Sequence, residues 1–79
     1  MPLYFFDTRD GDDFIKDDDG IELLHLAQVK VVAAKSLAEL ARDVLPGSVR
    51  RKLVIEVRDE RGPVMIVSLV FEAVVLVPQ

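Results

Sequence analysis

The segment Val64–Val77 reads VMIVSLVFEAVVLV and contains neither Gly nor Pro. Its many β-branched residues predict one long β-strand, in which successive side chains point to opposite faces of a sheet. The odd-numbered positions form an unbroken apolar face: Met65, Val67, Leu69, Phe71, Ala73, Val75 and Val77. The even-numbered positions are also apolar apart from Ser68 and Glu72. Because a strand with one wet face should alternate apolar and polar residues, we expect a further layer to cover the even face.

We predict that a second copy of the chain provides this cover, and that Ile66, Val70 and Val74 are buried in the resulting homodimer. Exposed apolar patches commonly mark association surfaces. A chain of 79 residues without Cys has a small core and no disulfides, so association is a common route to extra stability. The alternative is that the chain's own N-terminal segment or C-terminal tail folds over this face.

The period of the pattern changes between about residues 26 and 45, where apolar residues recur every three or four positions. This spacing predicts an amphipathic helix. Its stripe consists of Leu26, Val29, Ala33, Leu37, Leu40 and Val44. Pro46 and Gly47 should end the helix, because Pro cannot donate a hydrogen bond and Gly accepts a left-handed cap.

Three other segments read as strands. Residues 3–8 and the short segment 14–15 form a predicted hairpin around the Asp10-Gly11-Asp12 turn, and residues 17–20 form a loop. Residues 52–58 alternate cleanly between apolar and charged side chains, and a hairpin loop at 59–63 leads into the last strand.

The order strand, strand, helix, strand, strand indicates one α+β domain that covers residues 1–79. A helix returns the chain, so the third strand should run parallel to the second. The first and fourth strands are the most apolar, and we therefore place them at the centre of a four-stranded mixed sheet with the order 2-1-4-3. The helix should cover one face and pack on Tyr4, Phe6, Leu53, Ile55, Val57, Val67, Leu69 and Phe71.

Composition excludes several classes of function. The absence of Cys excludes thiol catalysis and Cys-based metal sites, and fits a reducing compartment. The formal net charge of −4 argues against nucleic-acid binding, since phosphate contacts supply most of that affinity. No signal peptide or membrane-spanning helix is recognisable, so we expect a cytoplasmic location without membrane contact.

The acidic loops near the N-terminus are a candidate calcium site. An EF-hand register that uses Gly11 or Gly20 places apolar residues at required ligand positions, so both registers fail. A looser cation site could still use Asp10, Asp12, Asp17 and Asp19. Asp is also a standard turn residue, and we favour solvated turns without a metal.

His25 is the one residue that suggests acid–base catalysis. It stands just before the helical stripe, where it can cap the helix or face solvent. No Ser lies in a nucleophile-elbow motif, and no Cys is present. We therefore predict no catalytic residue, no cofactor and no enzymatic activity.

The basic run Arg50-Arg51-Lys52 supports a different hypothesis, in which a small anionic ligand or nucleic acid binds a regulatory domain. The aromatic residues that stack on bases are not nearby, and acidic residues interrupt the patch. A charged strand that resists aggregation explains the run equally well.

The chain resembles a family of small bacterial proteins in four places. These are the opening MPLYFFD, the Asp-Gly pair at 10–11, the DDGIEL run at 18–23 and the LAELA run at 37–41. That family is catalogued as a domain of unknown function. The resemblance implies a compact bacterial α+β domain and implies no activity, ligand or catalytic residue. The residues themselves thus favour a non-enzymatic protein-interaction module that acts as a homodimer, and they leave room for an unidentified protein partner.

Overall fold

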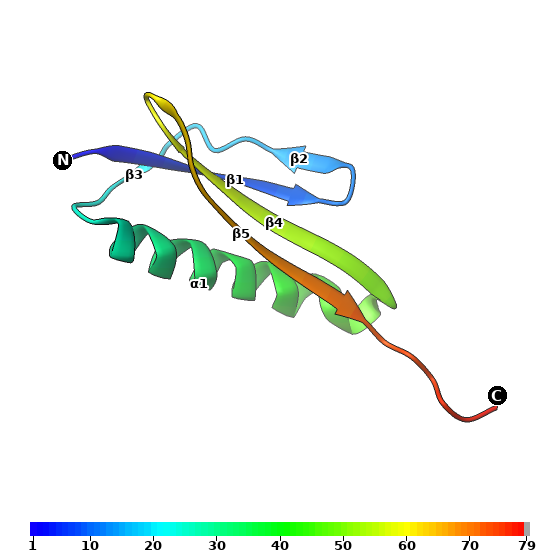
Figure 1. Ribbon diagram of the computed structural model, residues 1–79. Coiled ribbons are helices and arrows are strands. Elements are labelled where there is room, and N and C mark those ends of the chain that lie inside the picture. The colour runs from blue at the N-terminus through cyan, green and yellow to red at the C-terminus, as the bar shows by residue number, and fades with distance from the viewer. Residues whose placement is uncertain (79) are drawn as a thin grey trace.

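A computed structural model describes residues 1–78 of the chain (Figure 1). One long helix lies across one face of a twisted sheet, so the α+β class predicted from the sequence is confirmed. The elements are, in chain order, β1 (Leu3–Asp10), β2 (Asp13–Ile15), β3 (Ile21–Glu22), α1 (Leu26–Val44), a 3₁₀ turn (Leu45–Gly47), β4 (Arg50–Asp59) and β5 (Gly62–Glu72).

The predicted strand order and the mixed sheet are wrong. The observed order is β2-β1-β4-β5, with the two-residue β3 also paired to β1, and every pair of neighbours is antiparallel. The third predicted strand, observed as β4, does run parallel to β2 as expected, but β1 lies between them. The predicted order failed because apolar composition was taken as a sign of a central strand.

The central position of β4 follows from its connections. A tight turn at Glu60 and Arg61 joins β4 to β5, with Asp59 opposite Gly62, so the loop is shorter than the predicted 59–63. The other edge of β4 is already paired with β1. β5 therefore occupies the border of the sheet (Figure 1).

The helix begins and ends close to the predicted residues. His25 is its N-cap, and the side chain of Gln28 accepts hydrogen bonds from the backbone N–H groups of Leu24 and His25 at 2.9 and 3.1 Å. Gly47 does not adopt the expected left-handed cap. Instead the chain tightens into the 3₁₀ turn, where the Ser48 hydroxyl donates to the Val44 carbonyl at 2.6 Å.

The core lies between α1 and the sheet. The buried stripe of α1 is Val29, Ala33, Leu37 and Ala41, and it faces Tyr4, Leu53, Ile55 and Val57. Phe6, Leu40, Val44, Val67 and Leu69 pack around this cluster, as predicted. Two expectations fail: Leu26 in the first turn is 56% exposed, and Phe71 lies outside the cluster.

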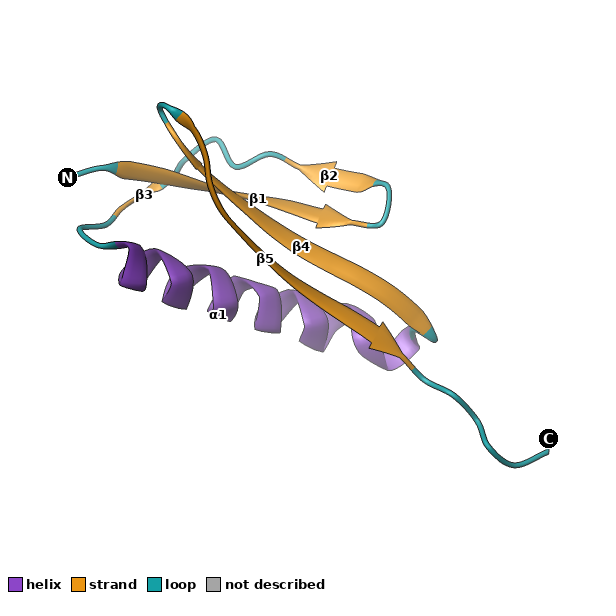
Figure 2. Cartoon of the chain, viewed as in Figure 1, coloured by secondary structure: helices purple, strands orange, loops and turns teal. Residues whose placement is uncertain are grey.

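The last strand is shorter than predicted. β5 ends at Glu72, and residues 73–78 leave the sheet as an extended tail (Figure 2). Ala73 donates a final hydrogen bond to the Val49 carbonyl at 2.8 Å, and beyond it β4 offers no residues for pairing. A strand needs a neighbour to satisfy its backbone, so the apolar sequence alone does not extend it.

Candidate protein-interaction surface

The face of the sheet opposite α1 has an apolar half on β5 and a polar half on β1 and β4. On β5 it presents Ile66, Ser68 and Val70, and the side chains of Ile66 and Val70 are 67% and 73% exposed. These are the even-numbered residues singled out in the sequence, and the structure brings two of them together. Val74 lies outside β5, in the extended tail.

The other half of the same face, over β1 and β4, is polar and internally paired. Arg9 contacts Glu56 at 2.9 Å and lies 4.6 Å from the centre of the Phe14 ring. Arg58 contacts Asp7 at 2.9 Å and lies over the Phe5 ring. These groups satisfy one another within the chain, and Ile66 and Val70 of β5 are the most exposed apolar side chains of this face among residues 1–78.

The border of the sheet at β5 leaves backbone groups without a strand partner. The backbone N–H of Ala73 donates to the Val49 carbonyl, so the backbone groups of residue 73 point toward β4. In an antiparallel pair, the N–H and C=O groups of every second residue point toward the same neighbouring strand. The odd-numbered residues from Met65 to Phe71 therefore bond to β4. The N–H and C=O groups of Ile66, Ser68 and Val70 point outward, and no strand of residues 1–78 pairs with them.

The opposite border of the sheet is formed by two short strands, which cover the outer edge of β1. Along the outer edge of β1, β3 pairs with Leu3 and Tyr4, and β2 pairs with residues 8–10. The gap between these short strands is filled by a side chain, because the Asp17 carboxylate accepts the N–H of Phe6 at 3.0 Å. β1 thus has partners on both sides along its length, in contrast with β5.

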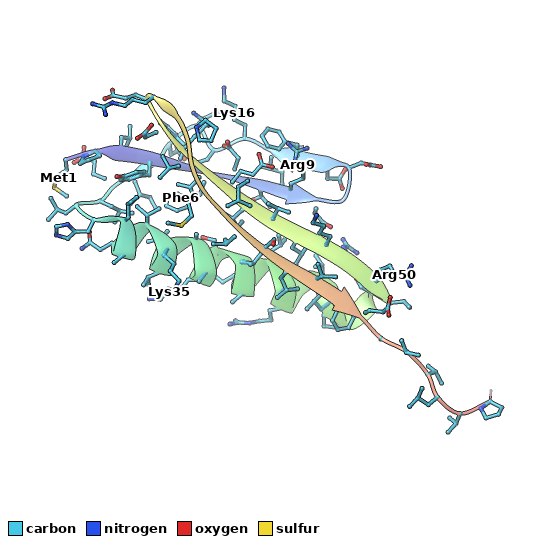
Figure 3. All side chains as sticks on the ribbon, viewed as in Figure 1. Met1, Phe6, Arg9, Lys16, Lys35 and Arg50 are labelled. Carbon is cyan, nitrogen blue, oxygen red and sulfur yellow. The ribbon has the colours of Figure 1, made fainter. Side chains whose placement is uncertain are left out.

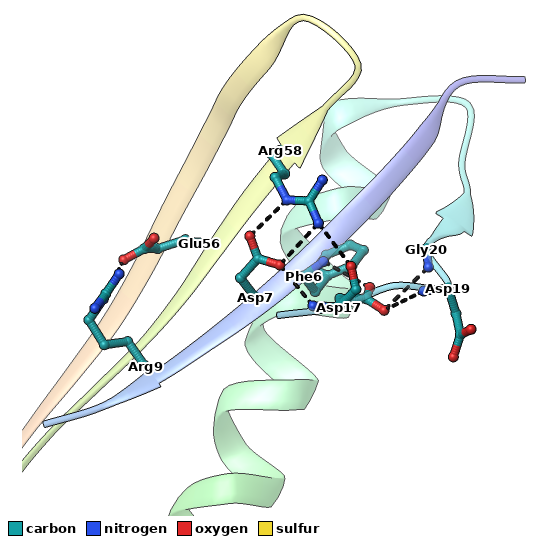
Figure 4. A network of polar contacts seen from close by, with 8 residues as sticks. All are labelled: Phe6, Asp7, Arg9, Asp17, Asp19, Gly20, Glu56 and Arg58. Atoms are coloured by element: carbon teal, nitrogen blue, oxygen red, sulfur yellow. Dashed lines mark hydrogen bonds and ion pairs between the residues drawn. The ribbon is translucent and has the colours of Figure 1, made fainter. Parts of the chain in front are cut away.

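Asp17 belongs to a network that fixes the loop between β2 and β3 (Figure 4). Its carboxylate also accepts the N–H groups of Asp19 and Gly20 at 3.0 and 3.3 Å. Its N–H donates to the carboxylate of Asp7, which is only 5% exposed, and its carbonyl accepts from Arg58 at 2.9 Å. Burial by itself raises the pKa of Asp17, but the three N–H donors and the charge of Arg58 outweigh it and lower the pKa below the ordinary value of 3.8.

The structure separates the residues of the basic run. Arg51 binds both carboxylate oxygens of Asp10 at 2.8 Å, and its hydrogen bond lowers the pKa of Asp10 below 3.8. Arg50 pairs with Glu72 at 2.6 Å, and both side chains are well exposed. Lys52 lines a depression of about 430 Å³ on the open face together with Arg9 and Glu56. Two of the three cations are therefore paired with carboxylates, which weakens the anion-binding alternative.

The other candidate groups do not converge. Among residues 1–78, no group of three or more acidic or His side chains is placed to hold a metal ion. Asp10 and Asp17 of the proposed cation set are instead engaged with Arg51 and with backbone N–H groups. His25 lies exposed at the start of α1.

The sequence did not predict β3 or the network around Asp17. β3 has two residues, too few for a visible alternation, and the Asp7–Arg58 pair joins positions 51 residues apart. The one available signal was the turn at Asp17–Gly20, where Gly20 has a φ of 75° that favours Gly.

A protein-family model matches most of the chain. Residues 3–70 match the model of a domain of unknown function, DUF6894. The chain belongs to this family. The resemblance predicted from the opening MPLYFFD and the helix is thereby confirmed. The matched part of this DUF6894 protein includes the helix and most of β5, and ends before the tail.

No curated protein and no solved structure gives a significant match to the chain. Within residues 1–78, α1 is not apolar enough to cross a membrane.

Proposed function

We propose that this protein is a non-enzymatic protein-interaction module that acts as a homodimer through β5. The observation that carries the proposal is the exposure of Ile66 and Val70 on a strand whose outer edge pairs with no strand of the described residues 1–78. Covering one such side chain stabilises a protein by about 1.5–3 kcal/mol, so several of them represent a substantial driving force for association.

A second copy is a better candidate for this cover than the chain's own ends. The C-terminal tail leaves the sheet in the direction of β5 and extends away from the domain (Figures 2 and 3). The N-terminal segment is held at the opposite border, where the carbonyl of Pro2 accepts the N–H of Leu23 at 3.1 Å. Among the described residues, neither the N-terminal segment nor the tail at 73–78 therefore lies over Ile66 and Val70.

The non-enzymatic part of the proposal rests on the chemistry of the polar groups. The arginines and carboxylates of the open face are paired with one another, and His25 lies at the start of the helix, away from this face. A catalytic site needs a nucleophile or a paired acid and base within hydrogen-bond reach. The described residues offer a surface suited to contact rather than to turnover.

The test is a pair of matched substitutions. Val70→Glu places a charge in the contact and should raise the dissociation constant of the dimer at least about tenfold. This corresponds to a loss of about 1.4 kcal/mol of binding free energy. Val31→Glu is the control, because Val31 is exposed on α1 and lies outside β5. Light scattering coupled to size-exclusion chromatography measures both masses. A wild-type monomer, or equal weakening by both substitutions, would contradict the proposal.

A further inference from the structure

We infer that β5 pairs edge to edge and antiparallel with β5 of a second copy, around a two-fold axis at Ser68, so that the two sheets join into one. This inference rests on the proposed homodimer and goes further, because it names the contacting segment, its direction and its register.

Edge-to-edge pairing is inferred because the same residues of β5 have both exposed side chains and outward-pointing backbone groups. Ile66, Ser68 and Val70 have exposed side chains, and their backbone N–H and C=O groups point away from β4. A partner placed over the open face would cover the side chains and leave these backbone groups unpaired. A strand added at the edge satisfies the backbone groups and brings new apolar side chains beside the old ones.

Beyond its first residues, β5 also lacks the features that normally protect an edge strand. Such strands are usually short, bulged, or marked by Lys or Pro. β5 has 11 residues, and its irregularities are confined to the start, where Pro63 and the bulge opposite Val57 and Arg58 lie. Between Pro63 and Glu72 it carries no charged residue. The other side of the sheet shows the contrast within one molecule, because short strands and the Asp17 carboxylate cover the outer edge of β1.

The register follows from the symmetry of the regular part of β5. Pairing from residue 65 to residue 71, beyond the bulge, places Ser68 at the centre, with Ile66 and Val70 at equal distances on either side. A two-fold axis there sets Ile66 opposite Val70 of the partner subunit and sets the two Ser68 hydroxyls against each other. A shift of the axis to Val67 would set Ile66 against the partner's Ser68, and so place an apolar side chain against a hydroxyl.

A second copy fits this edge because two β5 strands that run in opposite directions place apolar residues opposite apolar residues. Identical copies bring no like charges together across the centre, since Glu72 lies at the end of the strand and is paired with Arg50. In the proposed register Glu72 lies beside Val64 of the partner subunit. The contact is therefore isologous and closes after two copies.

Engineered cysteines provide a direct test, because the chain contains no Cys of its own. Directly opposed residues of a hydrogen-bonded antiparallel pair have Cα atoms about 5.5 Å apart, which a disulfide can bridge. We expect Ser68→Cys to form linked dimers rapidly under mild oxidation. Ile66→Cys and Val70→Cys should each link poorly alone, because identical positions lie four residues out of register, about 13 Å apart. A mixture of these two variants should give the linked heterodimer.

Val54→Cys is the control for a different packing, because Val54 lies on the same face but on β4. All four side chains are exposed or half-buried, so the substitutions should leave the fold intact, which circular dichroism verifies. Linking of Val54→Cys in place of Ser68→Cys would overturn edge pairing, and linking of Ile66→Cys with Ser68→Cys would overturn the register. Both results would leave the homodimer standing. A monomer in sedimentation equilibrium would instead overturn the proposed function together with this inference.

Discussion

At the scale of single residues, Asp17 substitutes for a missing piece of strand. Its carboxylate accepts the N–H of Phe6 at the point where neither β2 nor β3 reaches β1, and it also caps the turn that leads to Gly20. An ionised carboxylate can accept several hydrogen bonds at once, which an amide side chain cannot do without presenting its own donors. The negative charge at Asp17 is thus part of the fold.

We predict that Asp17→Asn lowers the free energy of unfolding at neutral pH by about 1–3 kcal/mol, because N–H groups lose a charged acceptor. The pKa of Asp17 is lowered in the folded state, so the stabilisation is complete above the ordinary value of 3.8 and is lost as the pH falls below it. Urea denaturation at neutral pH and below pH 3.8 measures both free energies. The difference between wild type and variant should shrink in acid.

The matched control is Asp18→Asn, because Asp18 is an exposed acidic residue of the same loop. This substitution should change stability by less than about 0.5 kcal/mol. A difference between wild type and Asp17→Asn that is equally large at both pH values would show that the charge of Asp17 is not responsible.

At the scale of secondary-structure elements, stability depends on the contact between α1 and the sheet. Leu37 is 8% exposed at the middle of the helical stripe, and the core has few large side chains to replace it. We predict that Leu37→Ala lowers the free energy of unfolding by about 2–5 kcal/mol. Lys35→Ala, at an exposed position of the same helix, should have little effect. A loss well under about 1 kcal/mol for Leu37→Ala would place this residue outside the core.

The same scale explains which parts of the fold could be predicted. The helix and its stripe were predictable, because a 3.6-residue period requires only local sequence. Strand order was not, because it depends on which edge each strand finds free. The apolar pattern of the last strand was taken to indicate a central strand with a second copy over its even face, whereas β5 lies at the border of the sheet. Val74 was misplaced for a related reason, since β4 ends before it can pair with that residue.

At the scale of the whole molecule, α1 covers one face of the sheet, and charged pairs occupy half of the other. The candidate surface on β5 was partly predictable. Ile66 and Val70 were identified from alternation alone, whereas the outward direction of their backbone groups required the observed pairing with β4. The proposed dimer accounts for both properties with one contact.

Hydrogen exchange of the backbone amides in wild-type protein tests this account most directly. The amides of Met65, Val67, Leu69 and Phe71 face β4 and should be protected in any folded state. At high protein concentration we predict comparable protection for the amides of Ile66, Ser68 and Val70, and a loss of that protection on dilution. Rapid exchange of these outward amides at every concentration, with their neighbours protected, would contradict the claim that β5 joins two copies of the chain.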